Sequence, residues 1–185
     1  MRAFYHDNVI ADQTALHDSG RAVSEEDLKA SGVLYWNIPV EDDGKWEDEI
    51  DAVARDRQYK NRDVKESSKA TLGESYEAMA KMVYKEHMHE DEEIRFVLSG
   101  SGFFDVREHP TDSWVRIHVS KGDLLVVPAG IYHRFSLDSS DYMKVMRLFK
   151  DEPKWLAHYR GAETDENPHR ADYLKNVQRV TALAA

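Results

Sequence analysis

Residues 86–93 read Glu-His-Met-His-Glu-Asp-Glu-Glu, and residues 122–133 read Gly-Asp-Leu-Leu-Val-Val-Pro-Ala-Gly-Ile-Tyr-His. The first stretch holds two histidines at positions i and i+2, followed by a glutamate four residues after the second histidine. The second stretch is an apolar strand, a Pro/Gly turn and a histidine at the start of another strand. These stretches decide the fold, because a site built from both of them requires distant strands to meet.

The first stretch has the donor groups of a metal site. His87 and His89 project from the same face of a predicted strand. Imidazole and carboxylate together suit Fe, Ni, Mn, Co or Zn. Four residues of straight strand span about 13 Å, so Glu93 reaches the same ion only if polar residues 90–92 form a bend. His133 is the fourth candidate ligand, because a barrel can bring its strand beside the others.

Each half of this pattern has a simpler explanation when it stands alone. A His-x-His pair is usually two surface or core histidines, and an acidic run is usually a solvated loop. The remaining histidines lie in loops, polar segments or an alternating strand and are expected to be structural or exposed: His6, His17, His109, His118, His158 and His169. For His118, we expect a solvent-facing side chain.

The two halves together resemble the two cupin motifs. The matching patterns are His87-x-His89-x3-Glu93-x6-Gly100 and Gly122-x5-Pro128-x-Gly130-x2-His133. The second pattern departs from its motif at Leu137, where the motif often has an Asn that is not a metal ligand. The resemblance implies one divalent ion held by the three histidines and the glutamate.

Short strand-like runs after residue 86 predict the rest of a barrel. They cover 93–98, 102–107, 114–119, 123–127, 132–137 and 143–149, with turn residues between them. Six short strands without a long helix between them imply antiparallel pairing in a small barrel or jelly roll.

The residues before this region are expected to be mainly helical. Apolar spacing and cap residues predict helices at 24–32, 46–57 and 74–85 and strands at 3–5 and 33–40, and a short helix is expected after Asp172. The predicted fold class is mainly β with N-terminal helices, a cupin-type antiparallel β-barrel (jelly roll). We expect a single cupin domain over 1–178, with a helical region at about 1–85, a barrel core at about 86–150 and a tail at 179–185.

Composition limits the class of protein. The chain has 185 residues, which suits one hydrophobic core, and a formal net charge of −10, which argues against broad nucleic-acid binding. It has no cysteine, so disulfides, thiolate metal sites and cysteine nucleophiles are excluded. No signal-peptide core or membrane-length apolar run is present. We expect a monomer in the cytoplasm, with the nucleus also open to a chain of this size.

Three further residues are candidates for a substrate pocket. Arg95 lies two residues beyond Glu93 and therefore on the same inward face. A divalent ion, one carboxylate and this arginine sum to about +2, which matches a dianionic enediolate. Phe135 shares a strand face with His133, and Trp155 could cover the barrel mouth. The alternatives are a surface ion pair for the arginine and plain core packing for the aromatic residues.

Longer segments of the sequence resemble one particular family and not only the cupin fold. They cover residues 59–64, 86–95, 100–107, 128–135 and 146–155, with His6-Asp7-Asn8 and Asp18-Ser19-Gly20 near the start. Over about residues 1–178 the chain resembles the acireductone dioxygenase family, in particular its eukaryotic, fungal-type branch. The family's ligands fall on His87, His89, Glu93 and His133, its pocket arginine on Arg95, and its pocket aromatics on Phe135 and Trp155.

The resemblance implies a reaction in methionine salvage. The substrate would be 1,2-dihydroxy-3-keto-5-methylthiopentene, an acireductone, and the co-substrate O₂. With Fe(II) the family yields 4-methylthio-2-oxobutanoate and formate, and with Ni(II) it yields 3-(methylthio)propanoate, formate and CO. Two alternatives stay open from the residues alone: another cupin enzyme, such as a sugar-phosphate isomerase or decarboxylase, and a non-catalytic regulatory cupin that binds metal.

Overall fold

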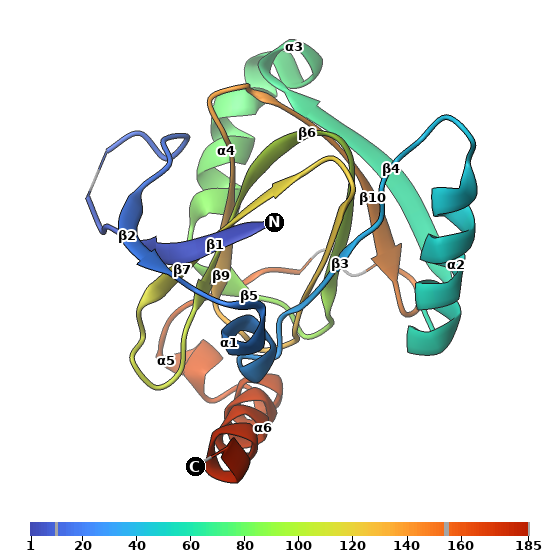
Figure 1. The fold of residues 1–185 in the computed structure, drawn as a ribbon. Helices are drawn as coiled ribbons and strands as arrows, with labels where there is room; N and C mark the ends of the chain where they lie inside the picture. The colour runs from blue at the N-terminus through green and yellow to red at the C-terminus, as the bar shows by residue number, and fades with distance from the viewer. Residues whose placement is uncertain (10, 154–155, 185) are drawn as a thin grey trace.

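The computed structural model describes residues 1–9, 11–153 and 156–184. Within them, eleven antiparallel strands form two facing layers that share one long strand (Figure 1). The strands are β1 (Arg2–His6), β2 (Asp18–Ala22), β3 (Leu34–Asn37), β4 (Asn61–Ser68), β5 (His87–Met88), β6 (Glu93–Arg107), β7 (Trp114–Ser120), β8 (Asp123–Val127), β9 (His133–Leu137), β10 (Tyr142–Phe149) and β11 (His158–Tyr159). The predicted fold class, an antiparallel β-barrel of cupin type, is confirmed.

Helices lie outside the strands. They are α1 (Glu25–Ala30), α2 (Lys45–Arg57), α3 (Lys69–Leu72), the 3₁₀ turn η1 (Gly73–Ser75), α4 (Tyr76–Tyr84), α5 (Ala162–Asp165) and α6 (Pro168–Ala184). Figure 1 shows α2 outside the barrel near β4, and α6 below it beside α1. No helix in the described part of the chain combines the length and the apolar character needed to cross a membrane.

The long strand β6 joins the two layers. Its first half, from Glu93, pairs with β8 and β10, and its second half, to Arg107, pairs with β7 and β9. The change of partner occurs near Gly100, which has a φ of +77°. We predicted two strands separated by a turn here. The chain instead stays extended and bends, because glycine adopts this backbone conformation without a steric penalty.

Two hydrophobic clusters hold the layers together. One fills the barrel interior and includes Val97, Phe104 and Ile117, and the other lies between the β8–β6–β10 layer and α2. Ile50 of α2 is fully buried in the second cluster. Every residue of β8 is buried, as expected for a central strand that is covered on both faces.

The predicted helices form, but strands intervene between them. The capping box of Ser24 and Asp27 starts α1, as the sequence indicated. The region 1–85, expected to be mainly helical, also supplies β1–β4 to the sheets. Both β2 and β4 went unpredicted because neither shows an apolar alternation.

The last helix is longer than predicted. It starts at Pro168 rather than after Asp172 and runs to Ala184, so the described residues of the segment 179–185, expected to be a tail, are helical. Tyr173 and Val177 are buried against the barrel, so tertiary packing stabilises the helix. The single-domain boundary at about residue 178 stays a prediction.

We predict that Gly100→Ala destabilises the protein by at least about 2 kcal/mol. A Cβ at this position would overlap the main-chain carbonyl of Tyr142, and φ is positive. Gly44→Ala is the matched control, because Gly44 also has a positive φ but nothing lies within 4 Å of its added Cβ. Urea unfolding measures both. Equal losses in the two variants would show that the close packing at Gly100 is not important.

Candidate metal centre

Four side chains from separate segments meet at one end of the barrel. His87 lies on β5 and pairs directly with His133, the first residue of β9. His89 follows β5, the chain then bends, and Glu93 opens β6 opposite Val127 of β8. The bend that the sequence required between His89 and Glu93 is present, because regular strand geometry stops at residue 88 and resumes at residue 93.

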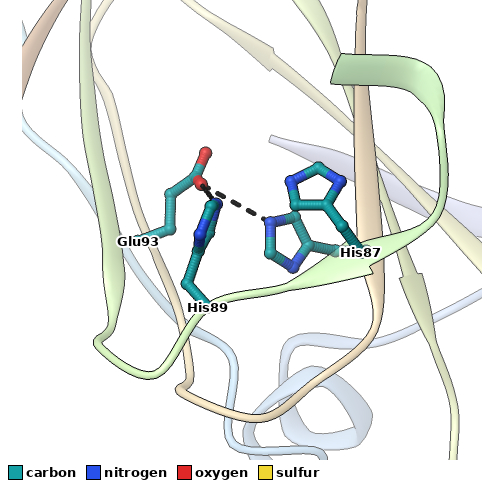
Figure 2. A group of neighbouring side chains, drawn as sticks. His87, His89 and Glu93 are labelled. Atoms are coloured by element: carbon teal, nitrogen blue, oxygen red, sulfur yellow. Dashed lines mark ion pairs between the residues drawn. The ribbon is translucent and has the colours of Figure 1, made fainter. Parts of the chain in front are cut away.

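The donor atoms of these four residues converge. One potential ligand atom from each of His87, His89, Glu93 and His133 lies within 4.8 Å of all the others. Glu93 Oε2 is 3.1 Å from His89 Nε2 and 3.4 Å from His133 Nε2. Figure 2 shows Glu93 and His89 directed toward one another, with His87 beside them. This compact set has the size of a single-ion site.

Backbone carbonyls orient all three imidazole rings. Nδ1 donates to the carbonyl of Lys85 from His87 (2.7 Å), of Leu156 from His89 (2.8 Å) and of Ile131 from His133 (3.1 Å). Since Nδ1 carries the proton in each ring, Nε2 is the atom with the free lone pair. This arrangement is typical of metal-binding histidines.

The donor set fits a metal ion. His133 Nε2 is buried and has no hydrogen-bond partner among the described residues, because its distance to the glutamate is too long for a good hydrogen bond. A buried lone pair without a donor is unfavourable, and a cation would satisfy it. Three imidazoles and a carboxylate could hold a divalent transition metal.

Electrostatics hold His87 and Glu93 in their metal-binding forms and favour the protonated form of His89. Burial, assisted by the nearby His133, lowers the pKa of His87 to about 4, so its ring is neutral at neutral pH. Burial alone would raise the pKa of Glu93, but Arg95 and the contacts with His133 and His89 hold it well below its usual range. For His89, burial acts to lower the pKa, and the carboxylate of Glu93 outweighs it and raises the pKa.

Arg95 lies beside the four residues rather than on the surface. Its Nη2 is 3.3 Å from Glu93 Oε1, and its Nη1 donates to the carbonyl of Ile94 at 3.0 Å. Burial lowers its pKa, yet a guanidinium stays charged at any physiological pH. Across the sheet, Arg95 is in register with Arg147, which makes a bidentate ion pair with Asp63 (2.7 and 2.5 Å).

A cavity of about 280 Å³ opens onto the four residues. Its walls are mostly apolar, with Met79, Val83 and Val145 among them. Phe135 lines it and packs on Phe104 with ring centres 4.9 Å apart. Trp155, the other predicted pocket aromatic, lies outside the described residues.

Several cavity residues were not found by sequence reasoning. They are polar or charged and come from the N-terminal region: Gln13, Thr14, Lys65 and Ser67, together with Arg147 of β10. The loop carrying Gln13 is fixed by fully buried Arg116, which donates to the carbonyl of Ala15 at 2.6 Å and pairs with Asp105. A sequence signal did exist for Lys65 and Ser67, because residues two apart in an extended run share one face of the strand.

His118 does not join this site, and its environment differs from the prediction. It was expected to face solvent, but it is partly buried against Phe103, and its Nε2 is 3.3 Å from Asp138. The aromatic ring and the carboxylate cover a position that strand alternation alone placed on the outer face.

His6, Asp7 and His17 form a second compact group of potential ligands. Ordinary hydrogen bonds account for much of this group. The main-chain N–H of Asn8 donates to His6 Nδ1 at 2.8 Å, and the two ring nitrogens of His17 bond Asp7 Oδ1 at 3.0 Å and the carbonyl of Asp12 at 2.8 Å. His6 Nε2 is buried without a hydrogen-bond partner among the described residues, so the expectation that His6 and His17 are structural stays a prediction.

Comparison with known proteins agrees with the site. The model of the ARD/ARD' family matches residues 2–157. The chain is 57% identical over 177 residues to "Acireductone dioxygenase 1" of Coprinopsis cinerea, covering 96% of this chain and 98% of the relative. It is 50% identical over 185 residues to "Acireductone dioxygenase" of Emericella nidulans, covering 100% and 99%.

A solved structure extends the likeness to the fold. "Acireductone dioxygenase from Bacillus anthracis with cadmium ion in active center" matches with a TM-score of 0.64 and 26% identity, covering 73% of this chain and 87% of that one. The family model matches most of the chain, and the relatives align over nearly its whole length. Both findings agree with the resemblance that the sequence motifs indicated. This chain belongs to the ARD/ARD' family.

Proposed function

We propose that this chain is a metal-dependent dioxygenase that cleaves an acireductone, 1,2-dihydroxy-3-keto-5-methylthiopentene, with O₂ in methionine salvage. The observation that carries the proposal is the convergence of three imidazole rings and Glu93 in the wall of a mostly apolar cavity, with Arg95 beside them. Full-length relatives that bear the name of this activity support it.

The proposed ligands are His87, His89, Glu93 and His133, and the proposed cofactor is one Fe(II) or Ni(II) ion. Both metals accept imidazole and carboxylate donors. When bound, such an ion supplies a Lewis acid and a template for the oxygen atoms of the substrate. The hydrogen bonds from each Nδ1 to a main-chain carbonyl hold the rings in the orientation that this requires.

The remaining residues bind and position the substrate. Arg95 is the proposed catalytic residue, because its guanidinium can stabilise negative charge on the substrate oxygens in a cavity of low polarity. Phe135 and the apolar cavity wall suit a methylthioethyl tail. Trp155 is proposed to complete this wall.

Glu93→Gln is predicted to lose bound metal and activity, because it removes the one anionic ligand while keeping the side-chain shape. Metal analysis after loading with Fe(II) or Ni(II) should find less than about a tenth of the wild-type content, and an oxygen electrode should detect no turnover. Glu66→Gln, on the outward face of β4, should behave as wild type. Normal metal content in Glu93→Gln would refute the ligand assignment.

Arg95→Gln is predicted to keep its metal and lower kcat/KM by about 10²–10³. The substitution removes a cation beside the substrate but leaves all four proposed ligands in place. Oxygen consumption gives the rate, and metal analysis of the same sample separates catalysis from metal loss. Arg62→Gln is the control, because Arg62 forms an exposed ion pair with Asp51. Unchanged kinetics in Arg95→Gln would exclude a role in the reaction.

Loading the apoprotein separately with Fe(II) and Ni(II) should change the products. We expect 4-methylthio-2-oxobutanoate and formate with iron, and 3-(methylthio)propanoate, formate and CO with nickel. Mass spectrometry of the acids and gas analysis of CO measure the outcome. A sugar-phosphate isomerase or a decarboxylase with the same ligands would consume no O₂ with this substrate.

A further inference from the structure

Strand β4 has its polarity reversed relative to an ordinary strand. Asp63, Lys65 and Ser67 are partly buried on its inward face, whereas Val64 on the opposite face is 52% exposed. Lys65 and Ser67 line the same cavity as the candidate metal centre. A charged side chain facing an apolar cavity costs free energy unless it finds a partner, so each inward charge needs an explanation.

Asp63 has a charged partner, and Lys65 has none among the described residues. Asp63 accepts two short hydrogen bonds from Arg147. The ammonium of Lys65 has Met79 Sδ at 3.5 Å, and a thioether is only a weak acceptor. No carboxylate of the described residues lies within ion-pair distance of Lys65 Nζ. Its N–H donors therefore face the cavity without a strong protein acceptor.

The register of the sheet places Lys65 on the same face as Arg95. Arg95, Arg147 and Asp63 lie in one row across β6, β10 and β4. Lys65 lies opposite Val145 in the next row on the same face. Relative to Arg95 it lies one row farther along the sheet and two strands across, a lateral separation of about 10 Å, and both side chains line the same cavity.

Positive charge is in excess on this face. Arg95, Arg147 and Lys65 oppose only Glu93 and Asp63, which leaves a surplus of about one positive charge before any metal is counted. Burial and repulsion from Arg147 and Arg95 lower the pKa of Lys65. An anion bound between these cations would relieve the repulsion and satisfy the free donors.

We propose that Lys65 is a substrate-binding residue that donates to an anionic oxygen of the bound molecule, so that the cavity selects oxyanions over neutral molecules with the same tail. This rests on the proposed function and adds a second cationic contact to Arg95. The ligand class is an enediolate or 2-oxo carboxylate with a short apolar tail. The contact acts on binding rather than on bond cleavage.

The kinetic test uses Lys65→Met in metal-loaded enzyme. This variant removes the charge and keeps the length and apolar packing of the side chain. KM for the acireductone should rise about tenfold while kcat changes less than about threefold, since binding is lost equally from ground and transition states. Lys65→Arg should restore most of the affinity. Lys69→Met, at an exposed lysine of α3, should leave KM unchanged.

A binding test gives a second readout without turnover. Isothermal titration of the nickel-loaded protein with 4-methylthio-2-oxobutanoate should give a Kd about tenfold higher in Lys65→Met, whereas the neutral amide of the same acid should bind both proteins equally. Lys65→Gln replaces Lys65→Met if the latter does not fold. Wild-type affinity for the acid in the neutral variant would overturn the proposal.

The two proposals can fail separately. Suppose that the wild type consumes no O₂ with an acireductone, while Lys65→Met binds the acid more weakly than the wild type does. The dioxygenase function is then wrong and the anion contact stands. If the wild type turns over and Lys65→Met keeps both KM and Kd within about twofold, Lys65 is only a lining residue.

Discussion

Each of the three imidazole rings at the candidate metal centre donates its Nδ1–H to a main-chain carbonyl, so each ring in its neutral form presents a bare Nε2 to the same group of atoms. The carboxylate of Glu93 faces that group as well. Acceptors that face one another in a buried space are unfavourable without a cation, and the raised pKa of His89 beside Glu93 reflects this need for positive charge. The barrel therefore holds an arrangement that a divalent ion stabilises, and the rest of the site follows from this constraint.

The arrangement depends on the curvature of β6. Glu93 and Arg95 lie at its first end, which pairs with β8, and Val106 near its other end pairs with His133 of β9. One strand thus carries a ligand in one layer and positions a ligand from the other. The left-handed φ of Gly100, at the change of partner, allows both roles.

The charge inside the cavity differs in sign from the charge of the whole chain. The chain has a formal net charge of −10, yet Arg95, Arg147 and Lys65 line the cavity beside the candidate metal centre. Mostly apolar walls strengthen the field of these groups by excluding water. The local field, and not the average surface charge, decides which small molecules bind.

The sequence by itself determined the local patterns. The spacing of His87, His89 and Glu93 required a strand followed by a bend, and both are present. Parity along β6 predicted that Arg95 shares a face with Glu93, and the 3.3 Å contact between them agrees. Local spacing is informative because it depends only on the geometry of a single element.

Only the tertiary structure decided which distant groups meet. The carbonyl of Leu156 that orients His89 has no sequence signal that links it to the site, and the alternation along β4 does not say which cavity Lys65 faces. The extent of α6 depends likewise on contacts of Tyr173 with the barrel. Pairing between remote segments is set by closure of the barrel and burial of the two cores, and no spacing within one segment records it.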